Sequence, residues 1–187
     1  TINDTATSQT DADKLILTDV APGEVTLTCA VNGTALLISV AGAGGPETLT
    51  ISNFFPTAAA SGTGVEEIIF SDGTVWSRAD IYKHTTRTGS AGNDTISASV
   101  YQDNIVGLAG NDTISAGAGD DYIVGGLGND SLDGQLGSDV YEWSKGDGND
   151  TINDTNNTAV SDVDVLKLVN VASTEVTLTR PVGSTDL

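Results

Sequence analysis

Aspartate recurs at every ninth position through the middle of this chain. Six nonapeptides follow one another without insertion over residues 89–142, and each carries aspartate at its sixth position: Asp94, Asp103, Asp112, Asp121, Asp130 and Asp139. Position four is glycine in five of the six repeats, with Tyr101 as the exception. Short carboxylates held in glycine-rich turns offer the oxygen ligands that a hard divalent cation such as Ca²⁺ prefers. The spacing therefore predicts a row of cation sites.

The rest of each nonapeptide indicates how these carboxylates are positioned. Glycine allows turns with positive φ, so residues one to six of a repeat are expected to form a tight loop. Residues seven to nine then make a short strand with the position-eight side chain inward: Ile96, Ile105, Ile114, Ile123, Leu132 and Tyr141. Two nonapeptides complete one coil, and stacked coils give two parallel sheets around a thin core. Loops of successive coils bring like charges together, and a cation between them reverses that repulsion, so the fold should need its metal.

The pattern resembles the GGxGxDxUx nonapeptide of the RTX (repeats-in-toxin) family, whose blocks form a parallel β-roll. The resemblance implies Ca²⁺ between loops one coil apart, pairing Asp94 with Asp112, Asp103 with Asp121, Asp112 with Asp130, and Asp121 with Asp139. Neighbouring side chains and backbone carbonyls should complete the shells: Asn93, Asn111, Asp120, Asn129, Gly92, Gly107, Gly110, Gly119, Gly125 and Gly128.

A further half-repeat over residues 146–152 would let Asp150 close a fifth site with Asp130. Tyr101 makes the second repeat degenerate, which weakens the prediction of a site between Asp103 and Asp121. We expect about four ions, within a range of three to five.

Composition excludes several classes of function. The 187 residues carry a net charge of −19, with 20 Asp against 6 Glu, which disfavours nucleic acid and anionic membranes as partners. No apolar run is long enough to span a membrane. Cys29 is the only cysteine and is expected to be an unreactive strand residue, and His84 is the only histidine, so a multi-histidine zinc site is excluded. No nucleophile elbow or phosphate-binding loop occurs, so we expect no enzyme activity in this chain.

Residues 1–85 are expected to form a small antiparallel β capping domain with a short helix. Strand-like runs cover residues 14–20, 24–31, 35–40, 47–51, 65–70 and 74–76, and Ser77 is a candidate N-cap for a helix through Tyr82. Residues 65–81, VEEIIFSDGTVWSRADI, resemble the end of the haemolysin-type calcium-binding-related domain, a resemblance that covers most of residues 13–85. It implies a cap on the all-β parallel roll at residues 89–155.

A second, longer repeat links the two ends of the chain. Residues 1–5, TINDT, recur at 151–155, and with one inserted residue Asp13 aligns with Asp164 and residues 24–28, EVTLT, with 175–179. We interpret the chain as one unit of a tandem array of cap and roll, with residues 156–187 beginning the next cap. The alternative is that 156–187 are capping strands that finish this roll.

Two functions follow as expectations. The first is a calcium-dependent folding and spacing module of a large secreted protein, which the RTX resemblance implies is exported from a Gram-negative bacterium by a type I system. The second is a recognition module of an adhesin or toxin that binds a surface glycan or receptor. In both readings we expect a monomer whose partners are calcium and the neighbouring repeats of the same chain.

Overall fold

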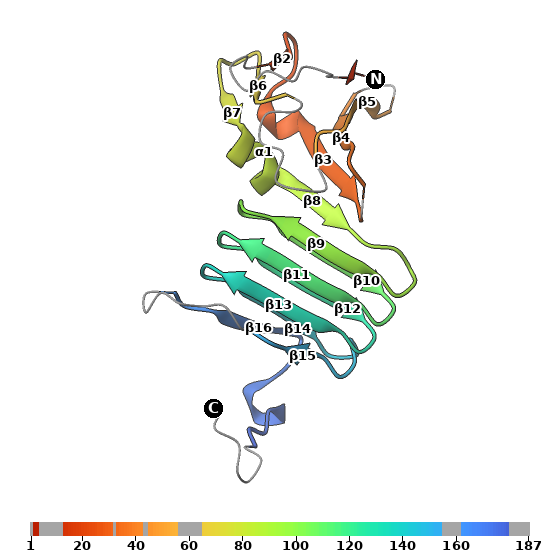
Figure 1. The fold of residues 1–187 in the computed structure, drawn as a ribbon, viewed down its shortest axis with the longest axis vertical. Coiled ribbons are helices and arrows are strands. Elements are labelled where there is room, and N and C mark those ends of the chain that lie inside the picture. Colours follow the sequence, from red (N-terminus) through yellow and green to blue (C-terminus); the bar gives the residue numbers. More distant parts are fainter. Residues whose placement is uncertain are drawn as a thin grey trace.

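In the part of the chain that the structure describes, the fold is a stack of strands with one short α-helix near its N-terminal end (Figure 1). This computed structural model describes residues 2–3, 13–31, 33–42, 45–55, 65–154 and 162–179. Its first part, which we call the β domain, comprises β1 to α1. Its second part, which we call the roll, comprises β8 to β16. Among the described residues, no helix has the length and apolar character needed to cross a membrane.

The described residues of the β domain form seven short strands. They are β1 (Ile2–Asn3), β2 (Lys14–Ile16), β3 (Val25–Ala30), β4 (Leu36–Val40), β5 (Glu47–Ser52), β6 (Glu67–Ile69) and β7 (Val75–Ser77). β3, β4 and β5 form an antiparallel meander, as expected, and β6 pairs antiparallel with β7. The structure adds parallel pairs that the sequence did not indicate, between β1 and β5 and between β2 and β6.

Alternation of apolar and polar residues explains which side chains enter the core of the β domain. Leu27 and Cys29 on β3 and Leu36 and Ile38 on β4 are buried, together with aromatic residues including Phe54 and Trp76. The strand expected to run from residue 14 to 20 ends at Ile16, because its partner β6 ends at Ile69 and the chain then turns back.

The predicted helix is present as α1 (Arg78–His84). The Ser77 hydroxyl accepts a hydrogen bond from the Asp80 backbone N–H at 3.3 Å, and the Asp80 carboxylate accepts from the Ser77 N–H at 2.9 Å. His84 ends this helix and its ring stacks on Trp76, with 4.1 Å between centroids. Cys29 is a buried strand residue, as expected, and burial raises the pKa of its thiol.

The roll consists of two stacks of parallel strands. One stack continues the sheet of the β domain in the order β3, β8 (Thr85–Thr88), β10 (Asn104–Ala109), β12 (Tyr122–Leu127), β14 (Val140–Ser144) and β16 (Val165–Val169). The other contains β9 (Thr95–Ser99), β11 (Thr113–Ala118), β13 (Ser131–Leu136) and β15 (Thr151–Ile152). The predicted all-β fold with a parallel β-roll is confirmed.

The register of the roll follows the predicted period. Ile96 pairs with Ile114, and Ile105 with Ile123, each one coil of two repeats apart. All six position-eight side chains are buried in one cluster. The strands are longer than expected, because pairing continues into the first three residues of the next repeat, as in Leu108 with Gly126. Only positions four to six are therefore loop.

The β domain and the roll are joined by packing as well as by the shared sheet. β3 pairs parallel with β8, and Val31 packs against the core of the roll. Tyr101 packs against the core of the β domain, with its ring centroid 4.8 Å from that of Tyr82. Tyr101, which replaces glycine at position four of its repeat, therefore anchors the first coil to the β domain.

Candidate metal centre

The position-six aspartates form two ladders, one at each edge of the roll. Asp94, Asp112, Asp130 and Asp150 precede the strands of one stack, and Asp103, Asp121, Asp139 and Asp164 precede those of the other. After the first member of each ladder, every carboxylate accepts a hydrogen bond from the backbone N–H of the aspartate one coil earlier. Asp112 Oδ1 lies 2.8 Å from Asp94 N, and Asp121 Oδ1 lies 2.7 Å from Asp103 N. The predicted pairs are thus neighbours in space.

The ladders extend to the last coil despite insertions in the sequence. Asp150 Oδ1 lies 3.0 Å from Asp130 N, and Asp164 Oδ1 lies 3.0 Å from Asp139 N. Asp164 was not among the residues predicted as ligands, because 25 residues separate it from Asp139. The available signal was that it directly precedes the apolar stretch Val165–Val169, as every position-six aspartate precedes its strand.

The second carboxylate oxygen of the buried aspartates has no hydrogen-bond partner. This holds for Oδ2 of Asp112, Asp121, Asp130 and Asp139, all of which lie on side chains that are almost fully buried. Burial without a counter-charge raises the pKa of each of these carboxyls, and raises that of Asp121 to about 8. A buried oxygen without a donor is costly, so these atoms indicate a missing positive partner.

Glycine at position one leaves room for those oxygens. A Cβ placed on Gly107 or Gly125 would lie under 3.0 Å from the Oδ2 atom of Asp112 or Asp130 in the same repeat. At position four, Gly110 and Gly128 have φ of 120° and 142°, and a Cβ there would collide with the backbone of the coil before. The loops therefore stack at a distance that only glycine permits at these positions.

The position-five side chains also bridge the coils, in the opposite direction. Asn93 Oδ1 accepts from Asn111 N at 2.8 Å, and Asn111 Oδ1 accepts from Asn129 N at 2.9 Å. Asp120 Oδ1 accepts from Ser138 N at 2.9 Å in the other edge. These predicted ligands are more exposed than the position-six aspartates, and their side-chain oxygens hold the loops in register.

Asp103 differs from the other members of its ladder. Its Oδ2 atom accepts from the Ser99 N–H at 3.0 Å and from the Ser99 hydroxyl. Burial raises the pKa of Asp103, while the Ser99 hydrogen bond and the charge of Arg87 lower it. Arg87 is buried on β8, beside Ile105 in the register. A fixed cation near Asp103 gives a physical reason to expect weaker metal binding between Asp103 and Asp121.

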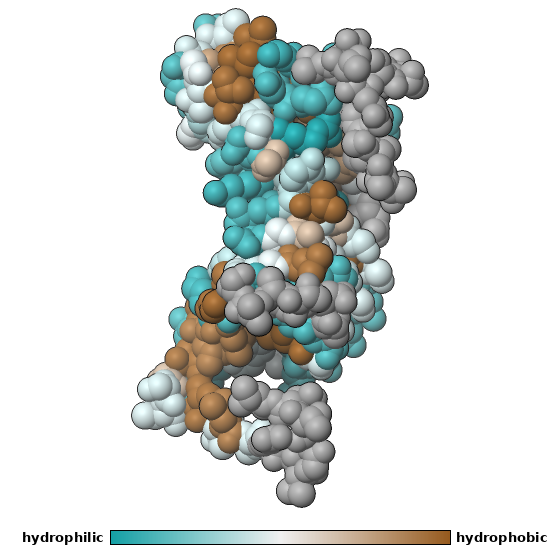
Figure 2. All heavy atoms as spheres, turned by 60° about the vertical axis from the view of Figure 1, so that its left-hand side comes forward, coloured by the Kyte–Doolittle hydropathy of each residue, from teal (hydrophilic) through white to brown (hydrophobic). Residues whose placement is uncertain are grey.

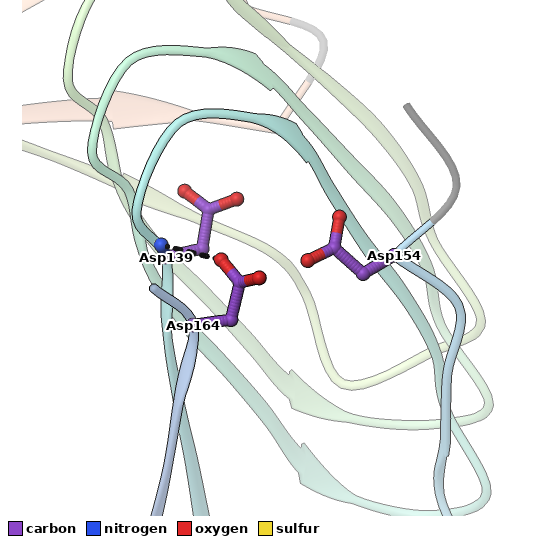
Figure 3. A group of neighbouring side chains, drawn as sticks. All are labelled: Asp139, Asp154 and Asp164. Carbon is purple, nitrogen blue, oxygen red and sulfur yellow. Dashed lines mark hydrogen bonds between the residues drawn. The ribbon is translucent and has the colours of Figure 1, made fainter. Parts of the chain in front are cut away.

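Three aspartates converge at the C-terminal end of the roll (Figure 3). One carboxylate oxygen from each of Asp139, Asp154 and Asp164 lies within 4.8 Å of the other two. Burial, a hydrogen bond with Asp164 and the charges of Asp164, Asp139 and Asp133 raise the pKa of Asp154 to about 7. Asp154 was not predicted as a ligand. It follows β15, and the equivalent position in the preceding coil is Gly134, which has no side-chain ligand.

The donor atoms fit a hard divalent cation. They are carboxylate, amide and backbone oxygens in loops without histidine or cysteine, which suits Ca²⁺ and not a transition metal. The orphaned Oδ2 atoms and the glycine positions beside them provide charge and space for such an ion between loops.

Comparison with known families agrees with this geometry. Residues 88–123, 99–132 and 106–141 each match a family model that describes four copies of the RTX calcium-binding nonapeptide repeat, and residues 36–80 match the haemolysin-type calcium binding protein related domain. The second match is narrower than the resemblance over residues 13–85. No curated protein matches the chain. The RTX repeat is a structural and not a catalytic unit, and proteins that carry it are typically secreted. The chain therefore carries a block of RTX calcium-binding nonapeptide repeats at residues 88–141, preceded by a segment that matches the haemolysin-type calcium binding protein related domain.

Proposed function

We propose that this chain is a folding module in which Ca²⁺ binds between successive loops of the roll. The observation that carries the proposal is the double ladder of buried aspartates whose second oxygens have no partner. The ladders offer five intervals between loops, within the three to five ions expected: three among Asp94, Asp112, Asp130 and Asp150 at one edge, and two among Asp121, Asp139 and Asp164 at the other. Asp154 would add a third carboxylate to the last of these sites.

Calcium would decide whether the roll is folded. Extracellular calcium modules have dissociation constants of about 10⁻⁴–10⁻³ M, so a site fills at extracellular calcium levels and empties in a calcium-poor cytosol. A ligand present at 100 times its dissociation constant stabilises the folded state by about 2.7 kcal/mol per site. Several such sites exceed the marginal stability that a thin core provides. The chain would then stay unfolded during export through a type I system of a Gram-negative bacterium and fold outside.

The folded roll would serve as a rigid spacer with the β domain as its N-terminal cap. Support comes from the sheet that runs without a break from β3 through β8 into the roll, and from the packing of Tyr101 against the β-domain core. We assign residues 1–85 to the cap, 89–155 to the main part of the roll, and the following strand β16 to its last coil. Recognition of a surface glycan or receptor has less support, because Trp76 is in the core and Trp143 is half-buried at the end of the roll.

Far-ultraviolet circular dichroism of the full chain, titrated with calcium from a chelated start, tests this function. A cooperative gain of β signal with calcium, and none with magnesium at the same concentrations, is the expected result. A spectrum that is already fully formed in chelator and does not respond to calcium would refute it. Magnesium is the matched control because it demands a tighter octahedral shell and loses its water reluctantly.

A further inference from the structure

The C-terminal end of the roll carries apolar side chains that nothing in the described structure covers. Ile152 pairs with Leu132 and Leu166 pairs with Tyr141, so both occupy the inward-facing position of the last coil. Leu166 is nevertheless 54% exposed and Leu168 37%. They line a groove of about 340 Å³ whose other walls include Leu132, Tyr141 and Trp143. Figure 2 shows apolar residues gathered at this lower end of the molecule.

The segment that forms this end is a copy of a segment in the β domain. Residues 164–179 align with 13–28 without a gap, with leucine at 15 and 166, leucine at 17 and 168, and EVTLT at 24–28 and 175–179. The local structures also agree. A strand is followed by a 3₁₀ turn, η1 (Pro22–Glu24) or η2 (Ser173–Glu175), and the glutamate accepts from the N–H of Ala21 or Ala172.

The two copies differ in what surrounds them. Leu15 and Leu17 pack against the core of the β domain, whereas their equivalents Leu166 and Leu168 face the open groove. Leu27 on β3 is 1% exposed, and its equivalent Leu178 is 92% exposed. The C-terminal copy thus has the apolar residues of a β domain without the domain that they would pack against.

The hydrogen-bonding edges of the equivalent strands are complementary. Leu17 donates its N–H to Ile69 O beside β6, and Asp13 O accepts from Glu67 N, so alternate residues from Asp13 to Leu17 face β6. On β16 it is Val165 that donates to Asp139 O beside β14. Backbone groups alternate in direction along a strand, so residues equivalent to the β6-facing set of β2 point away from β14. Among the described strands, β16 is the last of its sheet.

We propose that the groove at the end of the roll, with the free edge of β16, is the docking surface for a second copy of the β domain. β16 would take the place that β2 has in this chain, pairing with β14 by one edge and with the second copy's β6 strand by the other. Residues 175–179 would form the start of that copy's β3 strand, which buries Leu178. Each cap would then close the roll before it and begin the roll after it.

A two-unit chain tests this arrangement directly. Residues 1–179 are continued by a second copy of residues 29–187, because Thr179 is equivalent to Thr28. Amide hydrogen exchange is measured in calcium on this chain and on the 187-residue chain. Backbone amides at 164–169 and 175–179 of the first copy should exchange about 100-fold more slowly in the two-unit chain, because their opening then requires undocking of a folded domain.

Matched substitutions identify the surface. Replacing Leu166 and Leu168 by serine in the first copy should abolish the added protection. Leu127→Ser should leave it unchanged, since Leu127 is exposed on β12 and does not line the groove. Normal protection of residues 131–144 together with unchanged exchange at 164–179 would overturn the docking proposal while leaving calcium-driven folding intact.

Discussion

The substitution Asp121→Asn separates the electrostatic role of a ladder aspartate from its structural role. Asp121 Oδ1 accepts from the Asp103 N–H at 2.7 Å, and the Asp121 N–H donates to Asp139 Oδ1 at 2.8 Å. Asparagine keeps the amide oxygen that can accept the first bond and leaves the second bond untouched. What it removes is the charge, on a side chain that is 1% exposed and whose Oδ2 atom has no partner.

In chelator this removal should not destabilise the fold. Burial raises the pKa of Asp121 from 3.8 to about 8. At about pH 7 the assay is about three pH units above the ordinary pKa, and each unit corresponds to 1.36 kcal/mol. The buried charge of Asp121 therefore lowers the free energy of unfolding of the unchanged chain by up to about 4 kcal/mol, a cost that the variant with neutral asparagine does not have. This figure is an upper limit, because water at the loops screens the charge. The variant should be at least as stable as the unchanged chain.

Calcium should reduce that advantage. With dissociation constants of about 10⁻⁴–10⁻³ M, calcium at about 10 mM stabilises the folded state by about 1.4–2.7 kcal/mol per site. Asp121 faces a loop on either side, so its substitution affects the site toward Asp139 and the weaker site toward Asp103. Relative to the unchanged chain, the variant should lose about 1.4–2.7 kcal/mol through the site toward Asp139 when calcium replaces chelator, and less through the weaker one.

The free energy of unfolding is measured by urea titration with circular dichroism, in chelator and in calcium. An osmolyte is added equally to both chains so that a measurable fraction is folded in chelator. The control is Asp72→Asn, at an exposed turn of the β domain where Oδ1 accepts from Thr74 N at 2.8 Å. Its effect should be the same in both conditions. Equal destabilisation by Asp121→Asn with and without calcium would refute the reasoning and leave Asp121 as a structural hydrogen-bond acceptor.

Three further predictions follow from the same contacts. In chelator, acidification from about pH 8 to about pH 5 should raise the folded fraction seen by circular dichroism, because a carboxyl whose folded-state pKa is raised contributes stability at low pH that is lost as the pH rises through that pKa; a folded fraction that falls over this range would contradict it. Gly128→Ala should lower the free energy of unfolding in calcium by about 3 kcal/mol, because φ is 142° and the new Cβ would collide with Gly110 O. The control is Gly23→Ala, where the new Cβ would have no atom within 4 Å, and it should change the free energy of unfolding by less than about 0.5 kcal/mol. Asp154→Asn should weaken calcium binding at one site in isothermal titration calorimetry and leave the other sites unchanged, and an unchanged affinity at every site would exclude Asp154 as a ligand.

The sequence was sufficient to predict the roll because its period is strict. Fixed positions for aspartate and for an inward apolar residue determine the coil length, and Ile96 pairs with Ile114 as that length requires. Strand length was underestimated, since glycines such as Gly117 and Gly126 are typical of turns, although here their backbones pair with the adjacent coil. Local composition does not reveal backbone pairing with a strand that lies 18 residues away in the sequence.

The last coil and the β domain were harder to predict for a different reason. Insertions place Asp164 outside the nine-residue period, and Asp154 reaches the site from the end of a two-residue strand. Only the stacking of β16 on β14 brings them beside Asp139. Likewise the parallel partners of β1 and β2 lie about 50 residues away in the sequence, where periodicity carries no information about pairing.

A comparison of positions five and six of the loops shows why aspartate occupies position six. At position five, Asn93, Asn111 and Asn129 accept a backbone N–H from the next coil with a neutral amide oxygen. At position six, an aspartate accepts the equivalent bond with one oxygen and buries the second without a donor. Asparagine at position six would hold the coils together without the cost of a buried charge. Four of the six position-six aspartates, Asp112, Asp121, Asp130 and Asp139, bury such an oxygen. They therefore make the roll less stable without metal than it could be, which is the property that a calcium-dependent folding switch requires.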